Sequence, residues 1–239
     1  MNVALDLGNT LIKVGIFEGR DLRKKEVFET ASELKTFLTN FSGSNAIISS
    51  VSNDAAEVRE WITGFDRVLL LTPQLSVPVQ NRYASPETLG VDRLAAVCGA
   101  RDLFPGRNCL VISMGTCITY DLVDNGGQYH GGAISPGFMM RFKAMKTFTA
   151  RLPLVDPVES PPLLGRDTIS CMQSGVVWGV TDEIEGRIRR YEEIFPELQV
   201  ILTGGDGQFF ENKLKASIFA VPELVLRGLN SILLHNVSE

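Results

Sequence analysis

The stretch LVISMGTCITYDLV, from Leu110 to Val123, repeats the pattern of VALDLGNTLIKVGIF, from Val3 to Phe17. Each stretch has an apolar run, a short turn containing Gly and Thr, and a second apolar run, which is typical of two strands joined by a tight turn. The first copy carries Asp6 two residues before its glycine, where the second has Ser113. The repeat predicts a duplicated α/β unit, with one half at 1–108 and the other at 109–239.

The segments around the two hairpins alternate between strand and helix patterns. Strands are expected at 2–7, 12–18, 24–29, 45–52, 67–72 and 199–207 and on both sides of Gly115, and helices at 30–41, 54–65, 91–104, 137–152, 168–195 and 222–236. This alternation predicts sheets that are at least partly parallel. Residues 73–90 are rich in Pro, Asn and Ser and indicate a long loop, which in a compact chain is usually functional or disordered.

The composition is that of an ordinary soluble globular protein. The 239 residues are 44% hydrophobic and 21% charged, and the net charge is −5. An acidic chain repels phosphates, which argues against nucleic acid as a partner. No apolar run is long enough to cross a membrane, and Asp6 interrupts the N-terminus too early for a signal peptide, so we expect a cytoplasmic protein without a membrane partner.

The four cysteines show no paired C-x-x-C spacing, which indicates neither a zinc site nor a disulfide framework. We expect all four to be small buried hydrophobic residues. They are Cys98, Cys109, Cys117 and Cys171.

The two turns have the chemistry of a phosphate site. Glycine allows the backbone to approach a ligand, and free N–H groups and a threonine hydroxyl hold phosphate oxygens. A carboxylate at Asp6 would repel phosphate unless Mg²⁺ lay between them, since Mg²⁺ takes one or two carboxylates, phosphate oxygens and water. Lys13 could neutralise phosphate charge. The alternative is that the DLGNT sequence is only a hairpin turn.

The segment LGVDRLAA, Leu89 to Ala96, joins the long loop to a helix. Asp92 could act as a general base toward an attacking hydroxyl, and Arg93 could bind a carboxylate or carbonyl of the acceptor. The alternative for Asp92 is an acid that only complements the positive end of the helix dipole.

Taken together, these motifs resemble type III pantothenate kinases, of the acetate and sugar kinase/Hsp70/actin superfamily. The resemblance extends over nearly the whole chain, and its specificity lies in the order and spacing of the motifs. They are DLGNTLIK, ISSVS, NRYASPETLGVDRLAA, GTCITYD, GGAISPG, TARLP, GRDTISCMQSGVVWG, TGGDG and PELVLRGL.

The resemblance implies a duplicated ribonuclease H-like (actin-like ATPase) fold of class α/β, with two domains, mixed sheets and a cleft between them. It implies a transferase that phosphorylates the primary hydroxyl of pantothenate with ATP, the first step of coenzyme A biosynthesis. It also implies Mg²⁺, a monovalent cation such as potassium or ammonium, and a homodimer.

The resemblance assigns roles to particular residues. The ATP phosphates would be bound by Asp6, Leu7, Gly8, Asn9, Thr10, Leu11, Ile12, Lys13 and Thr116, with Asp6 also at the Mg²⁺ position, directly or through water. Pantothenate would be bound by Tyr83, Gly90, Val91, Asp92, Arg93 and Thr168, with Asp92 as the proton acceptor.

The chain departs from the family at Ser113, where the family usually has an aspartate that coordinates the monovalent cation. A hydroxyl offers lone pairs but no charge, so we expect a weaker cation site. Two other functions stay open: a catalytically impaired member that acts as a binding or regulatory protein, and another small-molecule kinase of the superfamily.

Overall fold

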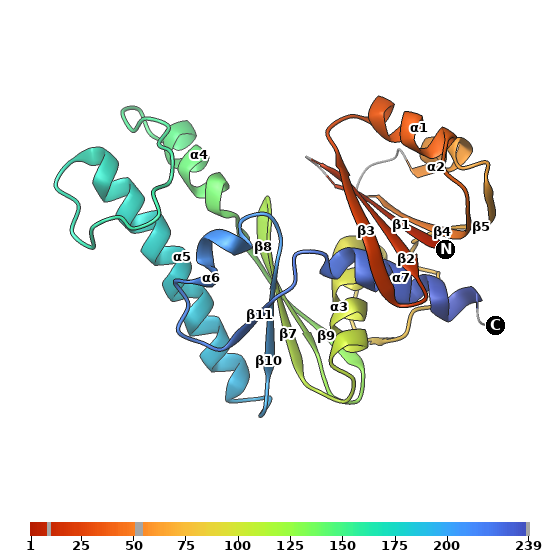
Figure 1. Ribbon diagram of the computed structural model, residues 1–239. Helices are drawn as coiled ribbons and strands as arrows, with labels where there is room; N and C mark the ends of the chain where they lie inside the picture. The colour runs from red at the N-terminus through yellow and green to blue at the C-terminus, as the bar shows by residue number, and fades with distance from the viewer. Residues whose placement is uncertain (9–10, 51–54, 238–239) are drawn as a thin grey trace. The chain divides into compact units, whose positions relative to one another are not determined.

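The computed structural model describes residues 1–8, 11–50 and 55–237 (Figure 1). Contacts between residues divide the chain into two compact units. Unit 1 contains Met1–Gly106, Asn125–His130 and Glu223–Glu239, and unit 2 contains Arg107–Asp124 and Gly131–Pro222. The C-terminal segment thus belongs to the same unit as the N-terminus. The division of the sequence into halves at residue 108 stays a prediction.

Unit 1 is built on a five-stranded mixed sheet with the order β3-β2-β1-β4-β5. Antiparallel pairing joins β1 to β2 and β2 to β3, while β1, β4 and β5 are parallel neighbours. Gly19, at a φ of 58°, allows the tight turn between β2 and β3. The strands are β1 (Asn2–Leu7), β2 (Ile12–Glu18), β3 (Asp21–Phe28), β4 (Gly43–Ser50) and β5 (Phe65–Leu70).

One face of this sheet is covered by α1 (Ala31–Thr39) and α2 (Ala55–Trp61), whose apolar side chains join those of the sheet in one core. Thr30 caps α1, because it forms a reciprocal capping box with Glu33. Two further helices of unit 1 are α3 (Val91–Leu103) and α7 (Leu224–Val237). They pack closely on each other, and α7 contacts β1 and β4.

The predicted loop at 73–90 contains two short elements, β6 (Gln80–Asn81) and a 3₁₀ helix at Pro86–Thr88. The strand β6 pairs in parallel with Gln128 and Tyr129, and the Arg82 side chain donates to Gln128. These contacts fix the loop on the rest of unit 1, ahead of α3.

Unit 2 contains a second mixed sheet with the order β11-β10-β7-β8-β9, followed by β6 of unit 1 beside the first residues of β9. The hairpin partners β7 and β8 are antiparallel, whereas β10 is parallel to β7 and β11. The strands are β7 (Cys109–Met114), β8 (Cys117–Val123), β9 (Gln128–Pro136), β10 (Gln199–Thr203) and β11 (Ile218–Ala220).

Apolar side chains of α4 (Phe138–Phe148), α5 (Thr168–Glu192) and α6 (Gly207–Glu211) share a core with this sheet. Phe138 and Phe142 of α4 are buried in it, so the apolar face of α4 is core. The class α/β with mixed sheets is therefore confirmed in both units.

The sequence patterns missed β9, β11 and α6, and they placed the end of α4 four residues too late. The strand β9 contains two glycines and β11 has three residues, so neither gives a clear two-residue period. The expectation of four buried cysteines holds for Cys98 and Cys109 but is wrong for Cys171, which is exposed, and for Cys117, which is only half-buried. In the part of the chain that the structure describes, no helix has the length and apolarity to cross a bilayer.

Candidate functional site

Asp6 lies near the end of β1, and its neighbours on the two adjacent strands are Lys13 and Ser49. The Asp6 side chain is buried, with 9% of the residue exposed. Burial raises the pKa of this carboxyl to about 6, Lys13 acts to lower it, and Asp92 acts to raise it. A carboxylate buried in this way is suited to a cationic partner.

The face of the sheet that carries Asp6 is the face opposite α1 and α2. Val3, Leu5 and Leu7 of β1 point into the core beneath those helices, so Asp6 points to the other side because side chains alternate along a strand. At the far end of the same face, Asn45 donates to Asn2 over 3.1 Å. Register partners on β1 and β4 therefore share this face, and Ser49 lies on it beside Asp6.

Asp92 and Arg93 lie in the first turn of α3, after the N-cap residue Gly90. A side chain at Gly90 would place its Cβ 2.7 Å from an Asp92 carboxylate oxygen, so glycine leaves room for that carboxylate. The electrostatic effect of Asp92 on Asp6 links the start of α3 to the end of β1. The structure therefore associates the predicted base with the predicted Mg²⁺ carboxylate, both within unit 1.

The structure also brings together two of the predicted pantothenate residues. The Arg93 guanidinium lies 5.6 Å from the centre of the Tyr83 ring, at cation–π distance, and Arg93 is 7% exposed. Tyr83 also stacks on Tyr129, with the two ring centres 6.3 Å apart. Tyr129 had no predicted role, because no sequence signal indicates that β9 returns beside the 73–90 loop.

Of the predicted phosphate-binding turn, Asn9 and Thr10 lie outside the described residues. Leu7 ends β1, Ile12 begins β2, and Leu11 is 38% exposed. A Cβ at Gly8 would lie 3.0 Å from the Leu11 carbonyl oxygen, which accounts for a glycine at this position.

The second hairpin belongs to unit 2. Ser113 has Thr119 and Thr203 as its neighbours on β8 and β10, so three hydroxyl side chains lie in one row across the sheet. The Thr119 Oγ1 atom is buried and has no hydrogen-bond partner in the described part of the chain. This row offers neutral oxygens to a cation, without a carboxylate at Ser113.

Thr116 lies in the turn of this hairpin, and the turn contacts the start of α4. The Gly137 N–H donates to the Thr116 carbonyl oxygen over 3.2 Å. A Cβ at Gly137 would lie 2.2 Å from that oxygen, so only glycine permits this approach. The start of α4 is thereby fixed against the turn.

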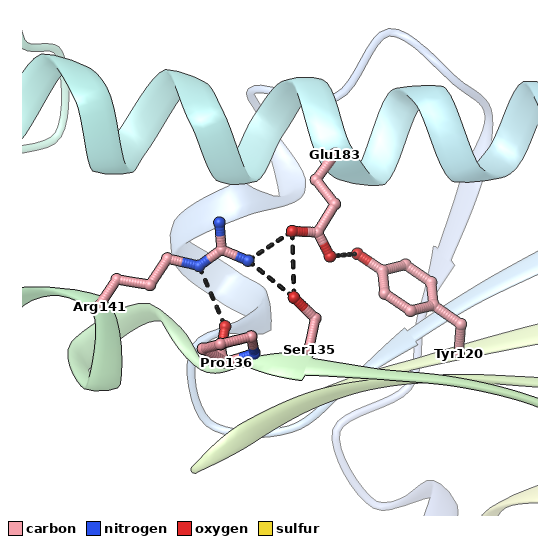
Figure 2. A network of polar contacts seen from close by, with 5 residues as sticks. All are labelled: Tyr120, Ser135, Pro136, Arg141 and Glu183. Carbon is pink, nitrogen blue, oxygen red and sulfur yellow. Dashed lines mark hydrogen bonds and ion pairs between the residues drawn. The ribbon is translucent and has the colours of Figure 1, made fainter. Parts of the chain in front are cut away.

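Figure 2 shows a polar network that holds the β9–α4 junction on α5. Arg141 donates to the Glu183 carboxylate, to Ser135 Oγ over 2.9 Å and to the Pro136 carbonyl oxygen over 3.0 Å. The Tyr120 and Ser135 hydroxyls donate to the same carboxylate over 2.9 and 3.1 Å.

These contacts decide the pKa of Glu183. Burial acts to raise the pKa of this carboxyl, but the hydrogen bonds from Arg141, Ser135 and Tyr120 together outweigh burial and hold it below its usual value. The network therefore keeps an ionised carboxylate, which fixes Arg141 and with it the start of α4.

Thr168 is the first residue of α5, and Asp167 caps this helix by accepting from the Ser170 N–H over 3.0 Å. Thr168 lines a surface hollow together with Met145, Arg166 and Cys171. This hollow lies in unit 2, whereas Tyr83, Gly90, Val91, Asp92 and Arg93 lie in unit 1. The roles that the resemblance gives to these residues stay predictions.

Within the described ranges, no group of three or more His, Cys, Asp or Glu side chains could hold a metal ion alone. The buried Asp6 carboxylate lies beside the Ser49 hydroxyl, which has no partner in the described part of the chain. One carboxylate and one hydroxyl fit Mg²⁺ that keeps most of its waters and is shared with phosphate. Ser49, Thr119, Glu183 and Arg141 received no role from the sequence, because their significance depends on strand pairing and helix packing.

Comparison with known proteins agrees with the resemblance. The sequence profile of the type III pantothenate kinase family matches residues 2–190. A type III pantothenate kinase of Bacteroides fragilis is 45% identical over 240 residues, which cover 99% of this chain and 98% of the relative. A type III pantothenate kinase of Christiangramia forsetii is 41% identical over 247 residues, with 100% of both chains covered.

Solved structures show the same fold at lower identity. A Campylobacter jejuni protein described as a Baf family transcriptional activator has a TM-score of 0.65 and 22% identity, over 99% of this chain and 100% of that one. The ROK hexokinase of Thermus thermophilus has a TM-score of 0.54 and 16% identity, over 99% and 98%. The fold is that of the actin-like kinases, and the full-length sequence matches establish that this chain belongs to the type III pantothenate kinase family.

Proposed function

We propose that this protein transfers the γ-phosphoryl group of ATP to the primary hydroxyl of pantothenate, the first step of coenzyme A biosynthesis. The observation that carries the proposal is the match to type III pantothenate kinases over the whole chain. The cluster of Asp6, Lys13 and Asp92 in unit 1 supports it, because phosphoryl transfer needs charge neutralisation beside a base.

In the proposed reaction, the pantothenate hydroxyl oxygen forms a bond to the γ-phosphorus, and the bond from that phosphorus to the ADP oxygen breaks. The hydroxyl proton passes to the Asp92 carboxylate. Asp6 holds hydrated Mg²⁺, which would neutralise charge on the phosphates when it is bound. Lys13 neutralises further phosphate charge, and the Arg93 guanidinium, held over the Tyr83 ring, binds the acceptor.

The row of Ser113, Thr119 and Thr203 is the proposed place of the monovalent cation. Oxygen ligands are present there, but the position that the family fills with aspartate is neutral. We therefore propose a weak cation site, with activity that depends little on potassium. A cytoplasmic location also belongs to the proposal.

The proposed homodimer has support in exposed apolar side chains between the end of α4 and the first residues of α5. Phe148, Leu163 and Leu164 are 85%, 75% and 81% exposed. In Figure 1 the long connection from α4 to α5 extends beyond the sheet of unit 2. Apolar surface of this kind is typical of a contact with another chain, and the family resemblance names a second copy.

The proposal is tested by a coupled assay of ADP release with and without pantothenate. We expect turnover that requires pantothenate, and a product that carries one phosphate on the primary hydroxyl. A panel of sugars serves as the control for other kinases of this fold. Turnover with a sugar but not with pantothenate would contradict the proposal, and absence of any turnover would favour a regulatory protein.

A further inference from the structure

Two side-chain atoms, Ser49 Oγ and Thr119 Oγ1, are buried without a hydrogen-bond partner in the part of the chain that the structure describes. Each lies beside the position two residues before the glycine of a hairpin: Ser49 is the register partner of Asp6, and Thr119 that of Ser113. A buried hydroxyl without a partner is destabilising. The two positions are not equivalent, because Ser49 lies on β4, the parallel neighbour of β1, and Thr119 lies on β8, the antiparallel hairpin partner of β7. A buried hydroxyl that has no partner and lies beside a buried carboxylate, as Ser49 does, indicates a ligand.

Of the two hydroxyls, Ser49 has more charged groups nearby that could bind a ligand. It is 0% exposed, it shares a sheet face with Asp6, and neighbouring strands are about 4.8 Å apart. The same face carries Lys13, and Asp92 acts electrostatically on Asp6 from the first turn of α3. A hydroxyl in this position can donate to one group and accept from another, which is what a water molecule needs.

We infer that Ser49 is a positioning residue for the hydrated divalent cation that accompanies the nucleotide. Its hydroxyl holds, by hydrogen bonding, a water molecule of the cation next to the Asp6 carboxylate. Neither the sequence motif nor the relatives' names give Ser49 this role. The inference rests on the proposed function, because it assumes that a metal–nucleotide complex binds beside Asp6.

Replacing Ser49 with alanine should therefore weaken cation binding without lowering the stability of the nucleotide-free protein. Among the described residues the Ser49 hydroxyl has no hydrogen-bond partner, so we expect its removal to break no bond within the chain and to leave the melting temperature of the nucleotide-free protein unchanged or higher. In the complex the variant loses a hydrogen bond to a water polarised by the cation. A bond of this strength corresponds to about tenfold weaker binding of the cation.

The experiment uses Mn²⁺ as a paramagnetic probe together with ADP. Binding of Mn²⁺ to the full chain is followed by electron paramagnetic resonance, and melting temperatures are measured without nucleotide. For Ser49→Ala we expect about tenfold weaker Mn²⁺ binding in the ADP complex and a melting temperature that is unchanged or higher. Ser49→Cys, which keeps the volume but hydrogen-bonds weakly, should also bind Mn²⁺ more weakly than the wild type.

The matched control is Ser174→Ala. Ser174 is also a buried serine, but its hydroxyl donates to the Leu163 carbonyl oxygen over 2.8 Å, far along the sequence from the site. This variant should melt at a lower temperature and bind Mn²⁺ like the wild type. If Ser49→Ala instead behaves like Ser174→Ala, the inference is wrong while the proposed function stands. If the wild type fails to bind Mn²⁺ with ADP, both the inference about Ser49 and the proposed function are wrong.

Discussion

The proposed phosphoryl transfer depends on the Asp92 carboxylate as its base. Asp92→Asn keeps the size of the side chain but removes the base, so we expect kcat to fall by about 10²–10⁴-fold. Nucleotide affinity should stay near that of the wild type, because Asp92 would contact the acceptor. Steady-state kinetics and ADP titration measure the two quantities.

The control for this variant is Asp102→Asn. Asp102 lies near the end of the same helix and pairs with the exposed Arg20 over 2.7 Å, so its replacement should leave kcat unchanged. If Asp92→Asn loses nucleotide binding while its kcat is retained, Asp92 belongs to the nucleotide site instead of acting as the base.

Ser113 decides the response to potassium. Because its row of hydroxyls has no negative charge at the family's cation position, we expect shallow activation of the wild type by potassium, and steep activation of Ser113→Asp. Potassium titrations of kcat/KM and of the melting temperature measure both, with sodium salts at equal ionic strength as the control. Steep potassium activation of the wild type would contradict the hypothesis.

At the scale of elements, α3 and α7 depend on two glycines. A Cβ at Gly228 would lie 1.7 Å from the Ala95 carbonyl oxygen, and one at Gly99 would lie 2.5 Å from the Leu224 carbonyl oxygen. Both contacts are with backbone, which cannot move aside without separating the helices. The close packing of α7 on α3 therefore has a definite cause in the sequence.

We expect Gly228→Ala to lower the free energy of unfolding by about 3 kcal/mol or more, because it forces these helices apart. Urea unfolding measures the change. Gly175→Ala is the matched control, since Gly175 is an exposed helical glycine with open space at its Cβ position. That variant should gain up to about 1 kcal/mol from alanine's higher helix propensity. Equal effects of the two variants would contradict the packing argument.

Glu183 joins β8, the end of β9, α4 and α5 (Figure 2). The pKa of this carboxyl is lower in the folded state, so its ionised form contributes stability above its unfolded value of 4.5, and this contribution is lost as pH falls through the folded pKa. Glu183→Gln should therefore lose about 2 kcal/mol at neutral pH, and the difference from the wild type should shrink in acid.

Unfolding measured between neutral and acidic pH checks this prediction. Glu192→Gln, an exposed change at the end of the same helix, should stay within about 0.5 kcal/mol of the wild type. A difference between Glu183→Gln and the wild type that is the same at every pH would show that lost packing, and not charge, decides the effect.

At the scale of the whole molecule, the exposed apolar side chains of unit 2 predict a dimer. Leu163→Asp combined with Leu164→Asp should convert the dimer to a monomer, because it places charge in the buried contact. Sedimentation velocity measures the state. Ile194→Asp is the control, since Ile194 is 69% exposed but lies beyond the other end of α5. A wild-type monomer, or a variant that stays dimeric, would contradict the prediction.

Much of the architecture could be predicted from the sequence because its signals are local. The alternation of strands and helices and the helix after Gly90 follow from patterns within a few residues. The short elements β6, β11 and α6 gave weak signals, as did β9, which contains two glycines. The exposure of Cys171 could not be predicted, since it depends on which side of α5 is covered.

By itself, the sequence determined the class α/β, the two glycine-containing hairpins and, through the order of its motifs, the family. It identified Asp6, Asp92 and Arg93 as candidate residues because their chemistry is visible in their side chains. Only the tertiary structure decided that Ser49 lies beside Asp6 without a partner among the described residues, that Arg93 lies over Tyr83 and that Glu183 fixes α4 on α5. The physical reason is that strand register and helix packing join residues far apart in the chain, and these long-range pairings leave no local periodicity.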